Sequence, residues 1–480
     1  MKKVILGAAA LFCGSLLFAQ DHDSNVTQSG IANLNSTVQS GWSHESNVTQ
    51  TGVANTSATN QSGGYLSIFG GVGGNGLSNV TQNGLANNSA VDQSGDGLNS
   101  TVNQDGIINN SDVDQDGGRH RSTVDQDGLA NQSTVTQSGG GGYFINLGNT
   151  SNVAQTGILN SSDVDQSGRD HDSDVDQDGL ANQSSVVQTG GGAYDGNESY
   201  VTQNGILNNS AVTQNGDDHY SDVDQLGLAN QSSVVQNGDD QDSRVYQEGI
   251  LNNSTVNQSG EDHTSEVAQV GLANQSSVVQ AGDNNFSDVD QLGILNNSVV
   301  DQDGDDHDSA VYQEGLANIS WVEQIGDDNE SQVTQVGILN DSYVYQVGND
   351  NFSDVDQNGL ANTSDVIQDG SFNQSTVYQG GALNYSGVLQ LGVDNESTVT
   401  QNGVLNGSVV AQLGAFNTST VSQTGLLNGS AVAQIGFGHT STVTQNGLLN
   451  GSIVLQTGLV GNTSTVTQTG ILNGDITIQN

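Results

Sequence analysis

The sequence predicts an all-β fold, a β-solenoid (β-helix) built from 11-residue strand–turn units that stack in parallel and in register. Three observations predict it. Glutamine recurs every 11 residues along almost the whole chain. The fixed residues around each Gln fall on alternate positions, which is the period of a strand with one buried face. A Gly stands two residues after each of these Gln residues except Gln479, at a place where a tight corner needs positive φ.

The first element is an N-terminal targeting segment, residues 1–19. Lys2 and Lys3 precede an apolar run that reaches Phe18. This pattern is typical of a secretory signal peptide, and the run is too short to span a bilayer. We therefore expect a secreted chain that is not embedded in a membrane. The single cysteine, Cys13, lies in this segment, so the mature chain has no disulfide and no thiol chemistry.

The remainder, residues 20–480, is one repeat array. Forty glutamines occupy the same position of a unit that reads Asn-x-Ser-x-Val-x-Gln-x-Gly-x-x. The turns after Gly alternate between apolar and acidic pairs, so one turn of the solenoid takes two strands and 22 residues. Forty units at two per turn make about 20 turns. Gly-rich surface insertions interrupt the spacing near residues 63–76, 139–148 and 190–196.

The fixed residues should form the inner face of the solenoid. We expect apolar ladders of Val and hydrogen-bonded ladders of Ser, Asn and Gln, each amide donating to the next turn as in cross-β assemblies. Because a buried polar group without a partner is costly, these positions need the repeat. In successive units the predicted ladder and turn residues are Ser210, Val212, Gln214, Gly216, Ser221, Val223, Gln225, Gly227, Asn230, Ser232, Val234 and Gln236.

The chain is strongly acidic, with 53 Asp and Glu against 6 Lys and Arg and a formal net charge of −47. A phosphate backbone would be repelled, so we expect no nucleic-acid partner. Asp pairs such as Asp222 and Asp224 flank the inward Val and should point outward. Two roles are open for them. They could bind Ca²⁺ or hold copies apart until the pH falls, or they could form a solvated face that keeps a β-rod soluble.

All eight histidines stand six residues before a Gln, where most units have Asn. Beside acidic turns they could line a metal-binding or proton-sensing edge; Ca²⁺ is the only cofactor that the composition suggests. They could also replace Asn as turn-capping groups, and we favour this interpretation because no ligand set recurs in every turn. The candidate metal residues are Asp217, Asp218, His219, Asp305, Asp306 and His307.

Outward Thr pairs near the C-terminus, such as Thr442 and Thr444, make an array that resembles the ice-binding face of β-solenoid antifreeze proteins. Thr is also a favourable exposed strand residue, and the rows give way upstream to Asp, Tyr and Ala, which favours this simpler interpretation. No nucleophile–His–acid group and no phosphate-binding loop stands apart from the repeat, so we expect no enzyme.

Gln28-x-Gly30-x-x-Asn33, followed by Gln39, resembles the curlin repeat of bacterial curli subunits, and the resemblance covers essentially the whole mature chain. Further residues that match the family's ladder pattern are Gln214, Gly216, Gln225, Asn230 and Gln236. The resemblance implies a secreted fibre subunit that self-associates outside the cell as a functional amyloid for cell adhesion and biofilm matrix. A nucleator subunit and an outer-membrane exporter are the further partners that it implies.

An alternative is a monomeric rod, either a β-solenoid surface adhesin or an ice-binding or Ca²⁺-binding protein. Electron microscopy separates these functions, because the first gives filaments and the second discrete rods. The repeat runs to Gln479, and an unpaired strand edge is a template for addition. The C-terminal third carries Leu389, Leu455 and Ile478 at outward positions. We therefore expect this end to dock first, and loss of residues 390–480 to slow fibre growth.

Overall fold

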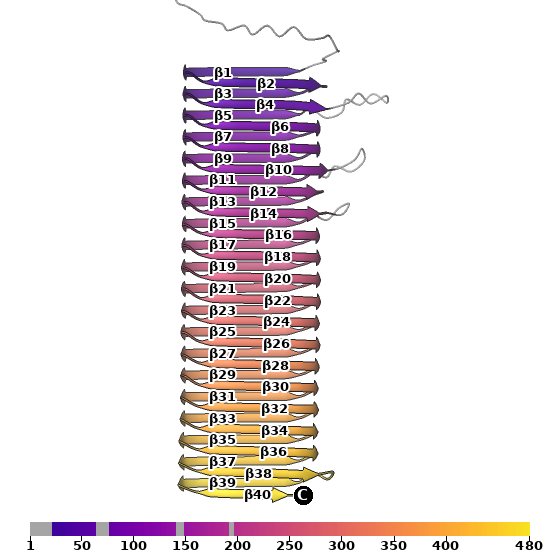
Figure 1. The fold of residues 1–480 in the computed structure, drawn as a ribbon, viewed down its shortest axis with the longest axis vertical. Coiled ribbons are helices and arrows are strands. Elements are labelled where there is room, and N and C mark those ends of the chain that lie inside the picture. Colours follow the sequence, from indigo (N-terminus) through magenta and orange to yellow (C-terminus); the bar gives the residue numbers. More distant parts are fainter. Residues whose placement is uncertain (1–21, 64–75, 141–147, 192–195) are drawn as a thin grey trace, which may run out of the picture.

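A computed structural model describes residues 22–63, 76–140, 148–191 and 196–480 of the chain. In these residues every regular element is a β-strand, and the strands form a long, straight rod of stacked turns (Figure 1). The odd-numbered strands are β1(Asp23–Ile31), β3(Glu45–Val53), β5(Leu77–Leu85), β7(Asn99–Ile107), β9(Arg121–Leu129), β11(Thr150–Ile158), β13(Asp172–Leu180), β15(Glu198–Ile206), β17(Tyr220–Leu228), β19(Asp242–Ile250), β21(Thr264–Leu272), β23(Phe286–Ile294), β25(Asp308–Leu316), β27(Glu330–Ile338), β29(Phe352–Leu360), β31(Gln374–Ala382), β33(Glu396–Val404), β35(Thr418–Leu426), β37(Thr440–Leu448) and β39(Thr463–Ile471). The even-numbered strands are β2(Leu34–Gly41), β4(Thr56–Gly63), β6(Asn88–Asp96), β8(Asn110–Gly118), β10(Gln132–Gly140), β12(Ser161–Gly168), β14(Gln183–Gly190), β16(Asn209–Asp217), β18(Gln231–Asp239), β20(Asn253–Glu261), β22(Gln275–Asp283), β24(Asn297–Asp305), β26(Ile319–Asp327), β28(Asp341–Asn349), β30(Thr363–Ser371), β32(Tyr385–Val393), β34(Gly407–Ala415), β36(Gly429–Phe437), β38(Gly451–Gly458) and β40(Gly474–Gln479).

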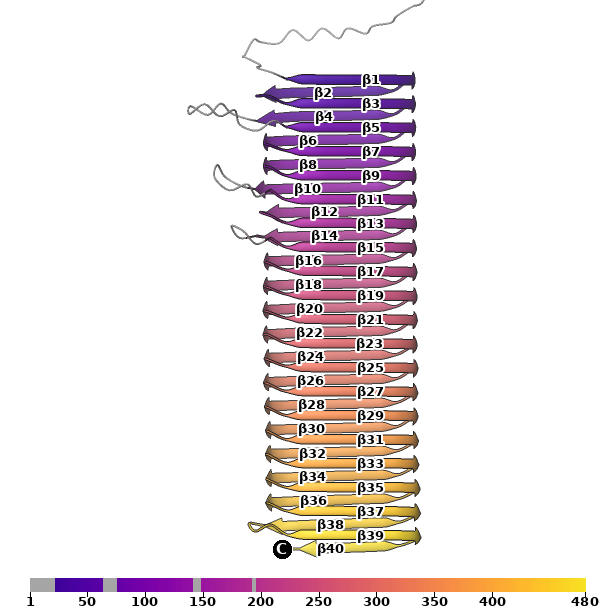
Figure 2. The same cartoon turned by 180° about the vertical axis from the view of Figure 1, so that it is seen from behind.

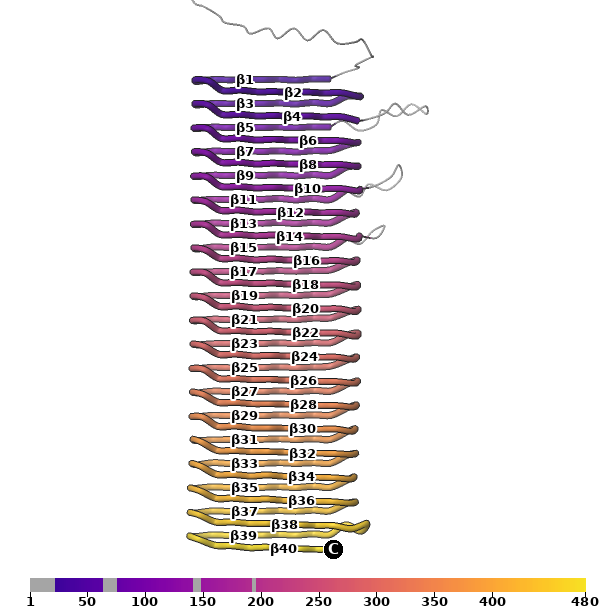
Figure 3. Tube along the Cα trace, in the orientation of Figure 1, coloured from indigo at the N-terminus to yellow at the C-terminus, as the bar shows by residue number. Residues whose placement is uncertain are grey.

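Each strand pairs in parallel with the strand one turn further on, and identical repeat positions meet. Ser221 on β17 faces Ser243 on β19, and Gln225 faces Gln247. Within the described residues the odd-numbered strands make one 20-stranded sheet and the even-numbered strands make the other (Figures 1 and 2). The chain therefore crosses from one sheet to the other at every corner. It advances by one strand spacing for every 22 residues (Figure 3). The predicted β-solenoid, its period and its in-register stacking are confirmed.

The corners depend on two residues with positive φ. Gly227 has φ 125°, and a Cβ added there would overlap the carbonyl oxygen of Gly249 in the next turn. Two residues later Ala229 has φ 55°, in the left-handed region, and its N–H donates to the carbonyl of Ile206 at 2.8 Å. The corners of successive turns are therefore hydrogen-bonded to one another like the strands.

The core is narrow and repeats once per strand. Its apolar part is a cluster of Val side chains that runs along the rod between the two sheets, and each of these Val residues is no more than 6% exposed. At the N-terminal end of the described rod, the equivalent Val26 is 44% exposed because no earlier described turn covers it. Burial at each position is therefore supplied by the turns above and below, as expected for a repeat protein.

The targeting segment predicted at residues 1–19 lies outside the described residues, as do the central parts of the three insertions. The strands that flank each insertion keep their register, since β3 pairs β5, β9 pairs β11 and β13 pairs β15 at equivalent positions. The insertions therefore leave the stacking of the described strands unchanged. Among the described residues, no helix is long and apolar enough to span a bilayer.

Candidate functional site

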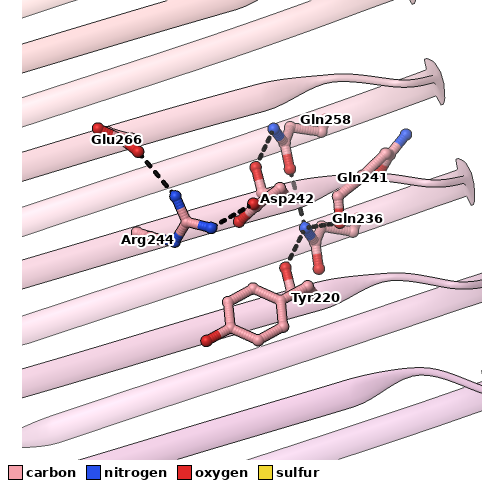
Figure 4. Close-up of polar contacts among 7 residues, drawn as sticks. All are labelled: Tyr220, Gln236, Gln241, Asp242, Arg244, Gln258 and Glu266. Atoms are coloured by element: carbon pink, nitrogen blue, oxygen red, sulfur yellow. Dashed lines mark hydrogen bonds and ion pairs between the residues drawn. The ribbon is translucent and has the colours of Figure 1, made fainter.

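The inner glutamines form a hydrogen-bonded ladder along each sheet. Gln236 Nε2 donates to Oε1 of Gln258, and Gln258 in turn donates to Gln280, both at 3.0 Å. Gln236 Nε2 also donates to the backbone carbonyls of Tyr220 at 2.9 Å and Gln241 at 3.0 Å (Figure 4). Because Tyr220 lies on β17 of the facing sheet, each amide joins two successive turns and both sheets.

The ladder has a direction. In the described turns the amide Nε2 of one Gln donates to Oε1 of the Gln one turn closer to the C-terminus, from Gln28 to Gln50 at one end and from Gln445 to Gln468 at the other. A row of aligned donors and acceptors of this kind is polar, and its members polarise one another. The two ends of the solenoid are therefore chemically different.

The asparagines hold the apolar corners. Asn230 accepts the N–H of Asn252 on Oδ1 at 3.1 Å, and its Nδ2 donates to the carbonyl of Leu226 at 3.0 Å. In the C-terminal part the amides also bond directly, as Asn384 Nδ2 does to Asn362 Oδ1 at 3.1 Å. The expected Asn-to-Asn ladder is thus present in the C-terminal part, while the capping of backbone groups extends further.

The expected hydrogen-bonded ladder of Ser is wrong. Ser210, Ser221 and Ser232 are buried and stack in register, but in the part of the chain that the structure describes their Oγ atoms have no hydrogen-bond partner. Successive Ser residues are separated by one strand spacing, about 4.8 Å. A hydroxymethyl group is too short to bridge that distance, whereas a Gln side chain is long enough.

The predicted ladder residues occupy two kinds of position. Those on the inner faces of β16, β17 and β18 are Ser210, Val212, Gln214, Ser221, Val223, Gln225, Ser232, Val234 and Gln236, all of them buried. Gly216, Gly227 and Asn230 form the corners. The residue order Asn-x-Ser-x-Val-x-Gln-x-Gly thus corresponds to corner, inner strand face and corner.

Histidine reproduces the contacts of Asn inside the solenoid. His263 is fully buried, its Nε2 lies 3.1 Å from the carbonyl of Ser259, and its Nδ1 accepts the N–H of Asn285 at 3.2 Å. In the next turn Asn285 Nδ2 donates to the carbonyl of Ala281 at 3.0 Å, and its Oδ1 accepts the N–H of His307 at 2.9 Å. These partners require neutral His with its proton on Nε2.

The structure separates the candidate metal residues. His219 and His307 are 1% exposed and face the interior. The carboxylate candidates lie in the adjacent surface turns and are Asp217, Asp218, Asp305 and Asp306. No group of three or more His, Cys, Asp and Glu side chains that could hold a metal ion is formed by the described residues. The imidazoles therefore face the interior, whereas these carboxylates lie on the outside of the same corners.

Outward acids crowd around one arginine on the odd-numbered sheet. Arg244 forms ion pairs with Asp242 at 2.7 Å and Glu266 at 2.8 Å (Figure 4). Beside it lies a shallow groove of about 300 Å³, whose charged lining residues are Asp222, Asp224, Arg244, Glu266, Asp288 and Asp290. The guanidinium thus pairs with two carboxylates, and the other four acids of the groove have no ion pair with it.

This crowding changes the proton affinity of the acids. Burial, followed by the negative charges of Asp290, Glu266 and Asp308, raises the pKa of Asp288 to about 6. Burial likewise raises the pKa of Asp222 and Asp224. A carboxyl whose pKa is raised on folding favours the fold below its unfolded pKa, and this contribution is lost as the pH rises through the folded value. For Asp288 the loss extends to about pH 6.

The histidines have the opposite effect on stability. Burial lowers the pKa of six of them, His44, His120, His171, His219, His263 and His307. Above about pH 6.5 they are neutral in both states and add no pH dependence. As the pH falls below that value the unfolded chain binds protons that the folded chain resists, so these residues destabilise the fold.

We predict that replacing these six histidines together by Asn raises the melting temperature at pH 5 and leaves it nearly unchanged at pH 7.5. Asn makes the same contacts and does not titrate, so only the acid-induced loss is removed. Melting curves followed by circular dichroism at both pH values test this. A variant that melts below the parent at pH 5 would show that His does not stand in for Asn.

Comparison with known proteins identifies the repeat. The curlin associated repeat matches four stretches of the chain, residues 148–179, 282–315, 326–359 and 392–425. Each stretch includes corners from both edges of the solenoid. No curated protein matches the chain.

Proposed function

We propose, from the premise that this chain is a curlin-repeat protein, that it is a structural subunit whose copies stack end to end into extracellular fibres for adhesion and biofilm matrix. The repeat and the solenoid fold indicate a structural protein rather than an enzyme. A nucleator and an export partner enter this proposal through the family alone.

The observation that supports stacking is the pair of open ends with complementary chemistry. Within the described residues β1 and β2 pair only with later strands, and β39 and β40 only with earlier ones. Unpaired strand edges are templates for addition of another chain. The inward-facing Val26, which would be covered in a longer rod, is exposed there.

The Gln ladder supplies the direction of stacking. At the C-terminal end Gln468 Nε2 donates to the carbonyl of Gly451 at 2.8 Å, and no Gln of the described odd-numbered sheet lies beyond it to accept a second bond. At the N-terminal end Gln28 donates to Gln50, and its own Oε1 is left as an acceptor. Head-to-tail stacking therefore continues the ladder, whereas head-to-head stacking would oppose two acceptors.

We predict that changing Gln468 and Gln479 together to Glu slows fibre elongation by about tenfold or more, because a carboxylate cannot donate to the next copy. Each new carboxylate still accepts the amide of the preceding turn, as Gln468 accepts from Gln445, and the bonds lost to backbone carbonyls lie in the last turn alone, so the rest of the rod should persist. Asn446→Asp, on the exposed outer face of β37, adds charge near the same end and is the control.

Electron microscopy and thioflavin kinetics of the mature protein provide the readout. The proposal predicts filaments with the cross-β spacing of about 4.8 Å and slow growth of the Gln468→Glu/Gln479→Glu variant alone. Discrete rods about 95 Å long at all concentrations would instead favour a monomeric adhesin. Equal growth rates for the double variant and the Asn446→Asp control would exclude the ladder as the docking contact.

A further inference from the structure

One edge of the solenoid is apolar along the whole described rod. It consists of the corners that follow the odd-numbered strands, each with two apolar residues between Gly and Asn, and we call it the apolar edge. In one such corner Leu251 has φ 59° and is 56% exposed. A left-handed backbone costs a non-glycine residue about 1 kcal/mol or more. Exposed Leu at this position gains little within the rod to offset that cost.

The second residue of these corners changes in size in an ordered way. The first three corners carry Ala32, Ala54 and Ala86. The central corners alternate large and small, in the order Ile108, Ala130, Leu159, Ala181, Leu207, Ala229, Leu251, Ala273, Leu295, Ala317, Leu339 and Ala361. The last five carry Leu383, Leu405, Leu427, Leu449 and Leu472. Because Leu fits in five consecutive corners, packing inside the rod does not require the alternation.

We propose that two copies of this chain pair side by side and antiparallel along the apolar edge, with the large residues of one copy filling the spaces over the small residues of the other. When the first corner of one copy lies opposite the last corner of the other, nine of the ten symmetric pairs match large with small. These pairs are Ala32 with Leu472, Ala54 with Leu449, Ala86 with Leu427, Ala130 with Leu383, Leu159 with Ala361, Ala181 with Leu339, Leu207 with Ala317, Ala229 with Leu295, and Leu251 with Ala273. The exception is Ile108 with Leu405.

The antiparallel arrangement is favoured over the parallel one by this order. Parallel copies in register would oppose Leu to Leu and Ala to Ala in every corner. A shift by one turn would match the alternating centre but would leave the three N-terminal Ala corners and the five C-terminal Leu corners unmatched. A two-fold axis between the corners of Leu251 and Ala273 satisfies the ends and the centre together, as an isologous contact requires.

The charge distribution of the two edges and the area of the apolar edge both support a second copy of this chain as the binding partner. The opposite edge carries exposed acids in its central corners, including Asp218, Asp240 and Asp306, whereas the apolar edge is followed by exposed amides such as Gln231 and Asn253. Pairing through the apolar edge thus keeps the acidic corners apart. An edge about 95 Å long and about 10 Å thick offers roughly 900 Å² per copy, close to the 800 Å² or so of a standard protein interface.

This pairing is independent of the proposed fibre growth, because one uses the edge and the other uses the ends of the rod. Cross-linking separates them. The double variant Ala130→Cys/Leu383→Cys places thiols opposite each other in an antiparallel pair. Within one chain the two positions are eleven turns apart, about 53 Å, and in end-to-end stacking they are nine turns apart, about 43 Å. The mature chain has no other cysteine.

We expect a short bis-maleimide to convert the double variant into covalent dimers, and neither single variant to give them. Asp218→Cys/Asp306→Cys, at symmetric heights on the opposite edge and also at positive φ, is the matched control and should stay monomeric. Dimers from either single variant would show parallel register and overturn the proposal. Absence of dimers from every variant would overturn it as well.

A size exchange tests the packing. Ala273→Leu puts Leu opposite Leu251 of the second copy and should weaken dimerisation about tenfold or more, because overpacked contacts are costly. Leu251→Ala/Ala273→Leu exchanges the large and small corners and should restore it. Sedimentation velocity over a range of concentrations measures both. Equal dimerisation of Ala273→Leu and the parent protein would exclude the interdigitated contact.

Discussion

Replacing Gly227 by Ala is expected to open the solenoid locally and to lower its stability there by about 3 kcal/mol or more. The backbone has φ 125° at this corner, which L-residues rarely adopt, and the new Cβ would overlap a backbone oxygen of the next turn. No flexible side chain can move aside to relieve that contact. The neighbouring turn would have to shift, and the strands that it holds would separate.

Gly429→Ala is the matched control. Gly429 begins β36 without a positive φ, and nothing lies within 4 Å of a Cβ built there. Its replacement should be neutral or should stabilise by about 0.4–1 kcal/mol, because Ala has less freedom in the unfolded chain. Limited proteolysis and hydrogen exchange around each site give the readout, since a repeat protein can open locally without unfolding completely. Equal protection around Gly227→Ala and Gly429→Ala would contradict the account.

Changing Gln258 to Glu should strongly destabilise the ladder, with a loss of about 3 kcal/mol or more. Gln258 is fully buried, and it donates to the carbonyl of Asp242 at 2.9 Å and to Gln280 Oε1 at 3.0 Å. A carboxylate would face both oxygens without a proton to share. The carbonyl of Asp242 is held by its strand, and turning the amide of Gln280 would break the three hydrogen bonds that its Nε2 donates.

Gln231→Glu makes the same chemical change at an exposed position of β18 and serves as the control. It should cost little, since the new charge remains in water. Denaturation of both variants at pH 7.5 and at pH 4.5 is the measurement. Protonation allows the buried carboxyl of the Gln258→Glu variant to donate again, so we expect this variant to recover partly at pH 4.5. Equal stability of the two variants at pH 7.5 would show that the ladder contributes little.

The fold was predictable because the 11-residue spacing of Gln determines both the strand pattern and the register between successive turns. A strand of alternating inner and outer residues, repeated every 11 residues, leaves few ways to bury its inner face. The Gln amide then adds a directional bond between turns, as from Gln236 to Gln258. A slip of register would break these bonds at every turn. Equivalent positions of successive repeats therefore stay paired in the structure.

Other features depend on distances that the sequence does not contain. The burial of Ser was predicted. Whether its hydroxyl has a hydrogen-bond partner depends on the length of the Ser side chain compared with the distance between adjacent strands. The second, backbone partner of each Gln lies on the facing sheet, as Tyr220 does for Gln236. Its identity follows only from how the two sheets are offset.

The role of His was partly predictable. Its position in the repeat indicated that it replaces Asn, and the contacts of His263 show how it does so. The size pattern of the apolar corners was also visible in the sequence. Its meaning required the structure, because only the stacked corners show that Leu251 and Ala273 lie on one continuous edge.

The central claim is that each 22-residue turn advances the chain by one strand spacing. Spin labels at Gln231 and Asp341 are five turns apart in the register of the even-numbered sheet, and labels at Gln231 and Gly451 are ten turns apart. Pulsed electron paramagnetic resonance on labelled protein diluted with unlabelled protein should give about 24 Å for the first pair and about 48 Å for the second. Broad distances, or distances that do not double between the two pairs, would contradict the solenoid.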